Sequence, residues 1–142
     1  MTKLSELLPN SPLFSQYRMT YLDDRNSGKM DCAYIAFMMV RREVLDEVGL
    51  MDESIYKYGE DIDLSIRASS RGWDIYYFAE TEALHHNIVI EGLEPKMKIE
   101  SRKTIYHLFR KHYQAKYGFT GLFISLILKT FLRLEPGEVD GA

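Results

Sequence analysis

Cysteine and an apolar leader are the two features that this sequence most clearly lacks, and each absence excludes a class of protein. Cys32 is the only cysteine among 142 residues, so a disulfide framework, a cysteine zinc cluster and a C-x-x-C redox motif are excluded. A reducing, cytosolic setting fits this composition. The start MTKLSELLPN lacks the basic residues and apolar core of a signal peptide, so we do not expect secretion.

A large excess of one charge and internal repetition are also missing. The 18 basic and 21 acidic residues give a net charge of -3, which argues against a surface built for nucleic acid. No repeat or low-complexity tract interrupts the chain. What is present is a composition of 46% hydrophobic and 13% aromatic residues over the length of one ordinary domain, which indicates a globular fold.

Strand-like and helix-like segments alternate along the chain, which predicts the α/β class. AYIAFMMV at 33–40 is an apolar run of strand length, and RREVLDEVG follows with apolar residues at helical spacing, closed by Gly49. EDIDLSIRASSRG predicts a helix that stops at Gly72, and WDIYYFA and EALHH predict two further strands. We therefore expect a buried strand, short helices and a mixed sheet.

Two more helices are predicted towards the C-terminus. From about residue 96 to Gly118, apolar positions recur at spacings of three and four, and the other face is basic. The last helix, at 119–134, is apolar nearly all round. It carries one thin polar stripe at spacing four, made of Gly121, Ser125, Lys129 and Arg133. Its helical residues span about 24 Å, short of the ~30 Å hydrocarbon core, so we do not expect it to cross a membrane.

The segment YKYGEDIDLSIR places Glu60, Asp61 and Asp63 at the start of a helix. Spacing alone leaves two interpretations. Acids in a first helical turn interact favourably with the helix dipole, and Asp63 lies four residues before Arg67, at an ion-pair spacing. Alternatively the acids carry chemistry, and the rest of the sequence has to decide.

Several motifs together give the chain a family resemblance. VRREVLDEVG, MDESIYKYGEDIDLSIR and RGWDIYYFAETEALHH, followed by a basic segment and RKHY, resemble the C-terminal, acceptor-side half of family 2 glycosyltransferases of the GT-A type. The matching stretch is about 31–113. The resemblance implies a partial GT-A-like mixed sheet flanked by helices, with an amphipathic or apolar C-terminal helix. The expected domains are a connector with a short helix at 1–29, the acceptor-side half at 30–116, and the apolar helix with its tail at 117–142.

The resemblance assigns the acids their roles. Asp61 would be the general base of an inverting transfer, because a sugar hydroxyl has a high pKa and attacks only when a carboxylate accepts its proton. Glu60 would line the acceptor pocket. We expect Asp63 to have a structural part instead, either at the helix start or as the partner of Arg67.

The resemblance also implies a divalent cation, Mn²⁺ or Mg²⁺, on the nucleotide diphosphate of the intact enzyme, and leaves open whether this chain binds one. Its ligand here would be His85. Consecutive strand residues point to opposite faces, so His85 and His86 are not both placed to reach one metal. The alternative is an ordinary structural histidine.

A cluster of cations lies between residues 96 and 116. It consists of Lys96, Lys98, Arg102, Lys103, Arg110, Lys111 and Lys116. The cluster is a solvated helix face, a site that closes over the donor diphosphate, or a surface that meets anionic lipid headgroups. Arg102 and Lys103 lie nearest the histidine motif and suit the diphosphate best.

The sequence departs from the family pattern in two places. The donor-binding half, with its D-x-D motif, has no counterpart, since Asp23 and Asp24 follow no apolar strand and are interpreted as solvated loop acids. Ile35 also stands where the family usually has glycine, and a branched side chain there would fill space next to the acceptor.

The resulting hypothesis is the acceptor-binding, catalytic-base half of an inverting glycosyltransferase of polysaccharide or cell-surface glycan synthesis, inactive without its donor half. Whether the chain is truncated, split or decayed stays open. Expected partners are a nucleotide-sugar donor, a glycan or lipid-linked acceptor, a second copy of the chain and, through 119–134, the inner face of the cell membrane. The rival hypothesis is a non-catalytic module for oligomerisation or membrane docking. Nucleic acid is not an expected partner, because the aromatic residues of the basic helix fall on its apolar face.

Overall fold

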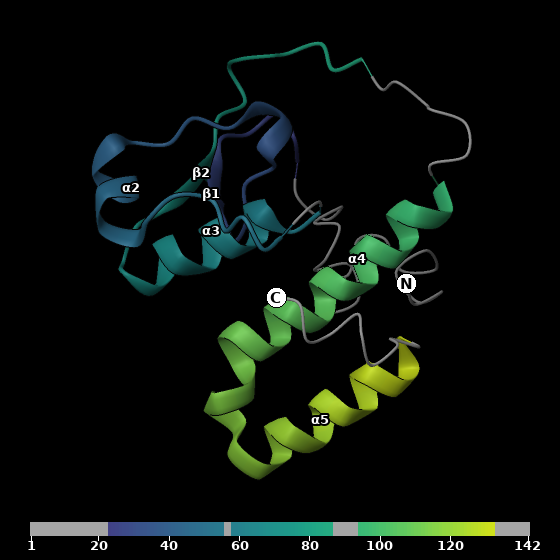
Figure 1. Ribbon diagram of the computed structural model, residues 1–142. Coiled ribbons are helices and arrows are strands. Elements are labelled where there is room, and N and C mark those ends of the chain that lie inside the picture. The colour runs from purple at the N-terminus through teal and green to yellow at the C-terminus, as the bar shows by residue number, and fades with distance from the viewer. Residues whose placement is uncertain (1–22, 56–57, 87–93, 133–142) are drawn as a thin grey trace. The chain divides into compact units, whose positions relative to one another are not determined.

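A computed structural model describes most of the chain (Figure 1). The described residues are 23–55, 58–86 and 94–132. They fall into two units, the first made of 23–29 and 76–82 and the second of 30–75 and 83–132. The short helix expected within 1–29 lies outside the described residues. Every candidate site residue belongs to the second unit.

The first unit contains a turn that Asp23 stabilises. Its carboxylate accepts hydrogen bonds from the backbone N–H of Arg25 at 3.0 Å and from the side-chain amide of Asn26 at 2.9 Å. The carbonyl of Asp24 accepts a hydrogen bond from the hydroxyl of Tyr77 at 2.9 Å. Both aspartates are exposed. Their interpretation as loop acids is confirmed.

The described strands form one small sheet, in which β1 (Gly28–Met30) pairs with β2 (Ile75–Tyr77). A mixed helix and sheet architecture is therefore present, but two of the expected strands are wrong. Residues 82–86, which include EALHH, have no regular structure and are exposed. The run 33–40 forms only a 3₁₀ turn, η1 (Ile35–Phe37), and Met39 within it is 99% exposed.

The apolar run is not a strand because no described strand lies beside it to take up its hydrogen bonds, and unpaired backbone groups need other partners. The N–H of Ala33 donates to Oγ of Ser65 at 3.2 Å, and the N–H of Ile35 donates to Oδ2 of Asp61 at 3.3 Å. Both acceptors lie on the helix α3 (Glu60–Ser70). Side chains of α3 thus take the place of a neighbouring strand.

The helices α2 (Arg42–Val48) and α3 pack against each other and hold much of the described core. Gly49 ends α2 with φ 85° and donates its N–H to the carbonyl of Leu45 at 2.9 Å, as the sequence predicts. Trp73, just beyond α3, donates its indole N–H to Glu47 of α2 at 2.8 Å. The buried apolar residues of the described chain are Val44, Ile55, Leu64, Ala68 and Leu108.

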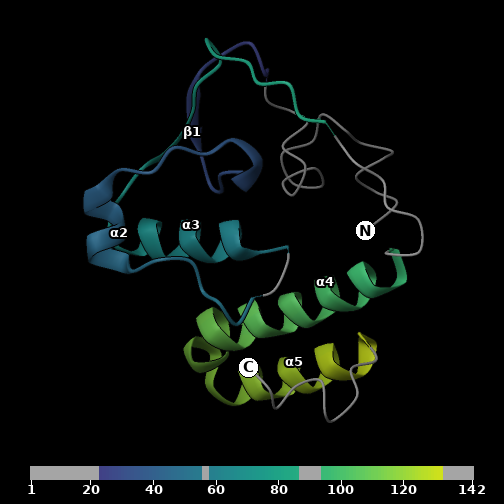
Figure 2. The same ribbon diagram turned by 45° about the horizontal axis from the view of Figure 1, so that its top comes forward.

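The C-terminal part is a helical hairpin. The helix α4 (Glu94–Phe109) continues into a π-helical turn, η2 (Arg110–Gln114), and a 3₁₀ turn, η3 (Ala115–Tyr117), before α5 (Gly118–Phe131) runs back beside it (Figure 2). The helix predicted to end near Gly118 is α-helical only as far as Phe109 and reaches Tyr117 through the two turns. Within the described residues, no helix is long and apolar enough to span a bilayer.

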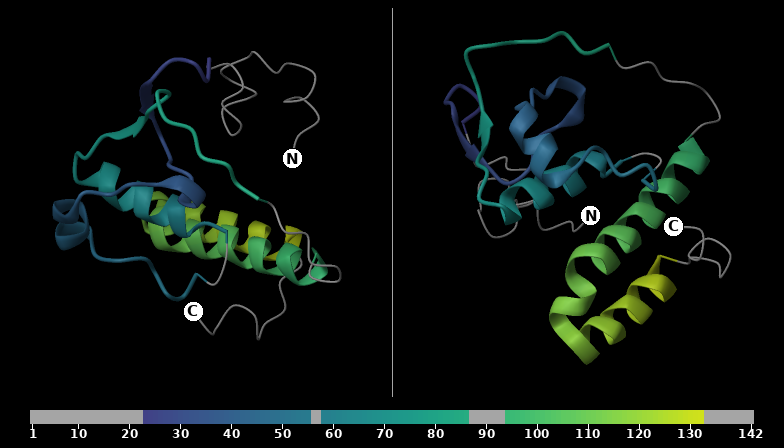
Figure 3. Two further views of the ribbon diagram at one scale, coloured as in Figure 1. Left: turned by 90° about the horizontal axis from the view of Figure 1, so that it is seen from above. Right: turned by 60° about the vertical axis from the view of Figure 1, so that its left-hand side comes forward.

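The small residues of α5 face the rest of the hairpin. Gly121 is buried so close to Gln114 that a Cβ atom at this position would overlap the carbonyl oxygen of Gln114. One turn further on, buried Ser125 donates a hydrogen bond to the hydroxyl of Tyr106 at 3.2 Å. The two helices of the hairpin are seen side by side in Figure 3. Small side chains on the inner face of α5 thus allow it to approach η2 and α4 closely.

Gly59 begins α3 in a conformation that only glycine adopts easily, with φ 128°, and a Cβ atom there would overlap Cγ2 of Thr104 on α4. We expect Gly59→Ala to lower the free energy of unfolding by about 1–3 kcal/mol more than Gly72→Ala, whose φ is also positive, at 85°, but whose surroundings are open. Urea denaturation measures both. Adding Thr104→Ser, which removes Cγ2 and keeps the hydroxyl, should recover part of the extra loss. Equal losses for the two alanine variants would contradict the close contact.

Candidate functional site

Three acids open α3, and the structure gives each a different environment. Glu60 is half-buried, and its Oε2 atom is buried without a hydrogen-bond partner among the described residues. Asp61 is 9% exposed and Asp63 is fully buried. Since buried carboxylate oxygens usually have donors, the unpaired oxygen of Glu60 stands out. Neighbouring acids of one helical turn are thus not equivalent.

Among the described residues, only backbone N–H groups hold the carboxylate of Asp61. Its Oδ2 accepts the N–H of Ile35 at 3.3 Å and its Oδ1 accepts the N–H of Ile62 at 2.8 Å. No ion pair to Asp61 is found within the described part of the chain. The predicted position at the N-terminal end of a helix is confirmed. A general base is expected to face an open cleft. The Asp61 side chain is buried in this structure, with 9% exposed, so that expectation is not met.

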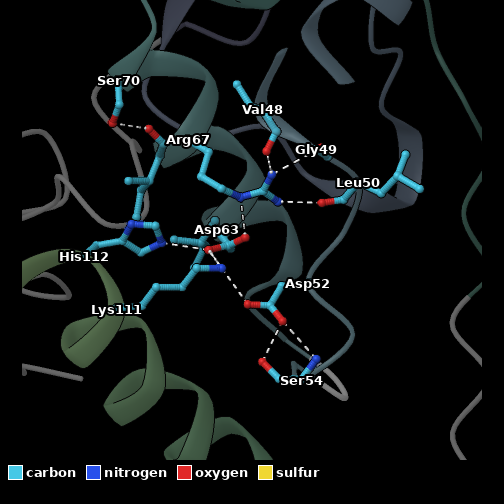
Figure 4. A network of polar contacts seen from close by, with 12 residues as sticks. Val48, Gly49, Leu50, Asp52, Ser54, Asp63, Arg67, Ser70, Lys111 and His112 are labelled. Atoms are coloured by element: carbon cyan, nitrogen blue, oxygen red, sulfur yellow. Dashed lines mark hydrogen bonds and ion pairs between the residues drawn. The ribbon is translucent and has the colours of Figure 1, made fainter. Parts of the chain in front are cut away.

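Asp63, in contrast, is surrounded by basic side chains (Figure 4). Its Oδ2 pairs with Nε of Arg67 at 2.8 Å, which confirms the pair predicted from the i, i+4 spacing. Its Oδ1 lies 2.8 Å from Nζ of Lys111 and 2.7 Å from Nε2 of His112, both on the π-helical turn η2. The acid thereby fastens α3 to the end of the α4 segment.

The electrostatics of this cluster follow from its contacts. Burial by itself would raise the pKa of the Asp63 carboxyl, but the hydrogen bonds that it accepts from its three basic partners outweigh burial and hold the pKa below its ordinary value. Burial would likewise lower the pKa of Lys111, and its hydrogen bonds to Asp52 and Asp63 raise it instead. Both groups are therefore charged at neutral pH.

Lys111 extends the cluster to a second acid. Its Nζ lies 2.5 Å from Oδ2 of Asp52, and this contact, with hydrogen bonds from Ser54, lowers the pKa of Asp52. His107 of α4 comes within 3.6 Å of the same oxygen. The loop after α2 is thus tied to the end of α4.

Arg67 connects the cluster to α2. Besides its pair with Asp63, its guanidinium donates to the carbonyls of Val48 at 2.6 Å, Gly49 at 3.2 Å and Leu50 at 2.9 Å. These carbonyls end α2 and have no partner inside that helix. Arg67 thereby donates hydrogen bonds to the carbonyls at the end of α2 and also forms an ion pair with Asp63.

His85, the predicted metal ligand, is exposed and lies in a segment without regular structure. Its ring meets that of Tyr34 edge-on, with 6.5 Å between the ring centroids. Within the described residues, no group of three or more His, Cys, Asp or Glu side chains is placed to hold a metal ion. One exposed imidazole does not make a metal site by itself, so we derive no step of a reaction through a metal.

Arg102 and Lys103, the predicted diphosphate ligands, are half-buried on α4. Nη1 of Arg102 donates to the carbonyl of Leu132 at the end of α5, at 3.0 Å. Lys103 pairs with Glu100 at 3.3 Å. Both side chains therefore have contacts inside the hairpin, and their part in donor binding stays a prediction.

Sequence reasoning missed the residues that complete the Asp63 cluster, namely Lys111, His112 and Asp52. The basic motif RKHY could have indicated the two basic residues. From the sequence alone, we interpret its cations as part of a solvated, diphosphate-binding or lipid-facing surface. Its two central residues instead neutralise a buried acid.

The sequence was compared with protein-family profiles, curated proteins and solved structures. The sequence profile described as glycosyltransferase-like family 2 matches residues 15–116, and the chain belongs to this family. This agrees with the expected resemblance. No solved structure matches the chain significantly.

Two curated relatives come from Mycobacterium tuberculosis, strains CDC 1551 / Oshkosh and ATCC 25618 / H37Rv. Each is named N-acetylglucosaminyl-diphospho-decaprenol L-rhamnosyltransferase and is 29% identical to this chain over 108 residues. The matched region is 75% of this chain and 34% of each relative. The chain thus spans about a third of the length of these curated relatives.

Proposed function

We propose that residues 30–116 form the acceptor-side, catalytic-base half of an inverting glycosyltransferase that uses a nucleotide-sugar donor. The observation that carries the proposal is the separation of roles at the start of α3. Asp63 is paired with three basic side chains, whereas Asp61, two residues away, accepts hydrogen bonds from two backbone N–H groups and has no ion pair among the described residues. A general base needs a carboxylate that is not already paired with a cation.

In the proposed reaction, the carboxylate of Asp61 accepts the proton of an acceptor hydroxyl. The hydroxyl oxygen forms a bond to the anomeric carbon of the donor sugar, and the bond from that carbon to the diphosphate breaks on the opposite face, so the anomeric centre is inverted. The nucleoside diphosphate leaves with the bonding electron pair. Glu60, the neighbouring acid, would line the acceptor pocket beside Asp61.

The substrate class follows from the relatives. Their name identifies an acceptor in which a sugar diphosphate is carried on decaprenol. We propose an acceptor of the same kind, a lipid-linked glycan, and hence work at the cytoplasmic face of the membrane where polysaccharides are assembled. In the intact enzyme we propose that Arg102, Lys103 and His85 face the donor diphosphate and its divalent cation. Self-association of the chain is also part of the proposal.

The test replaces the matched third of the mycobacterial rhamnosyltransferase by this chain. We expect the chimera to transfer sugar to a lipid-linked acceptor, detected as a mass increase of that acceptor, and the isolated chain to transfer none. Calorimetry with the nucleoside diphosphate provides the control, because it shows that the donor half of the chimera is folded. A chimera that binds donor but yields no product would favour the non-catalytic module.

A further inference from the structure

The outer face of α5 is apolar, although the helix lies at the surface. We define this outward face by six exposed residues, Phe119, Leu122, Phe123, Leu126, Ile127 and Phe131. They recur at spacings of three and four, and Phe119 is 92% exposed. A surface helix normally turns such a stripe towards the core. Here the buried positions belong to Gly121 and Ser125, so the usual orientation is inverted.

The inversion is fixed by the contacts of the inner face. Gly121 touches the backbone of Gln114, where no larger side chain fits, and Ser125 bonds to Tyr106. Rotating α5 to bury its phenylalanines would place large side chains at these close contacts. The outward face is therefore a consequence of packing, and soluble monomers rarely leave an apolar surface of this kind open.

The charge around this face indicates what covers it. Residues 94–132 contain eight lysines and arginines and two glutamates, and the cations next to α5 itself are Lys116 and Lys129. Lys116 precedes α5 and Lys129 lies in its last turn, so cations flank the apolar stripe. A second copy docked on the same face would bring these lysines near their own counterparts, whereas anionic lipid headgroups attract both ends of the helix.

We propose that α5 docks in the plane of an anionic membrane surface, with its outward face buried among the lipid acyl chains and its lysines at the headgroups. Its 14 residues extend about 21 Å, a length suited to lying in the interface. The inference rests on the proposed function in one respect, since a lipid-linked acceptor presents its sugar at this surface. The docking itself requires neither donor nor acceptor.

The test is co-sedimentation of the full chain with vesicles of phosphatidylcholine and phosphatidylglycerol. We expect binding, and a loss of about tenfold or more in the partition coefficient for the double variant Phe119→Ser/Phe123→Ser, because even one partly buried phenylalanine accounts for such a factor. The matched control is Phe37→Ser/Met39→Ser, which removes two equally exposed apolar side chains elsewhere and should leave binding unchanged. Lys116→Gln/Lys129→Gln should weaken binding to anionic vesicles and reduce its dependence on salt.

Three outcomes overturn the proposal: no binding of the full chain to anionic vesicles, an equal loss in the matched control, or a dimer in light scattering that Phe119→Ser/Phe123→Ser dissociates while no vesicle binding is seen. The last outcome would assign the face to a second copy. Vesicle binding is measured without nucleotide sugar, so a chain that binds vesicles while the chimera fails to transfer sugar separates this inference from the proposed reaction.

Discussion

Replacing Asp61 by asparagine is expected to lower kcat of the chimeric transferase by about 10²–10⁴-fold, with donor affinity unchanged. Asparagine has nearly the same shape, but its amide cannot take the proton of the acceptor hydroxyl. The measurement is a steady-state assay with the lipid-linked acceptor over a range of pH.

Asp61→Asn is also expected to change the free energy of unfolding. The Asp61 carboxylate accepts two backbone N–H groups, and an asparagine side chain replaces one accepting oxygen by an N–H donor. A loss of about 1 kcal/mol is expected from this mismatch, too little to explain a large loss of kcat. Asp46→Asn, on an exposed acid of α2, serves as the control for both measurements. Retained turnover in Asp61→Asn would assign the base to another residue.

Asp63→Ala is expected to lower the free energy of unfolding of the chain by about 3–5 kcal/mol, a large share of the stability of a small domain. The reason is that its basic partners remain partly buried after their carboxylate has been removed. Arg67 and His112 have side chains only 18% and 11% exposed, and both lose the acid that compensates them. Urea denaturation followed by circular dichroism gives the value.

The matched control is Asp46→Ala, which also breaks an i, i+4 pair. The pair of Asp46 with Arg42 has side chains 61% and 83% exposed, and exposed pairs of this kind contribute about 0–1 kcal/mol. His112→Gln, which removes one partner and leaves the acid with two, should fall between the two alanine variants. Equal stabilities for Asp63→Ala and Asp46→Ala would mean that the cluster does not hold α3 in place.

Local patterns of the sequence were sufficient for α2 and α3. Gly49 and Gly72 follow these helices as predicted, and both have a positive φ. Glycine after an apolar helical pattern predicts such a helix end because it adopts a positive φ easily. The pair of Asp63 with Arg67 was predicted for the same reason, because both residues lie on one helix at a fixed spacing.

Features that depend on distant partners were not predicted. The run 33–40 has the composition of a strand, but a strand also requires a neighbour, and the described chain provides Ser65 and Asp61 side chains instead. The pairing of Asp63 with Lys111 and His112 spans up to 49 residues, and it relies on a π-helical turn that shifts helical faces. No periodicity of three and four indicates such a turn.

Arg67 has a consequence for the order in which the chain folds. Its bonds to the end of α2 close loops of 17 to 19 residues, whereas the bond between Asp63 and His112 closes one of 49. The longer loop costs about 0.8 kcal/mol more in chain entropy, so we expect the α2–α3 pair to close first. During synthesis this pair precedes the C-terminal hairpin as well. We therefore expect Asp63 to be paired with Arg67 before Lys111 and His112 reach it, so that the last helices pack onto an acid that already has one basic partner.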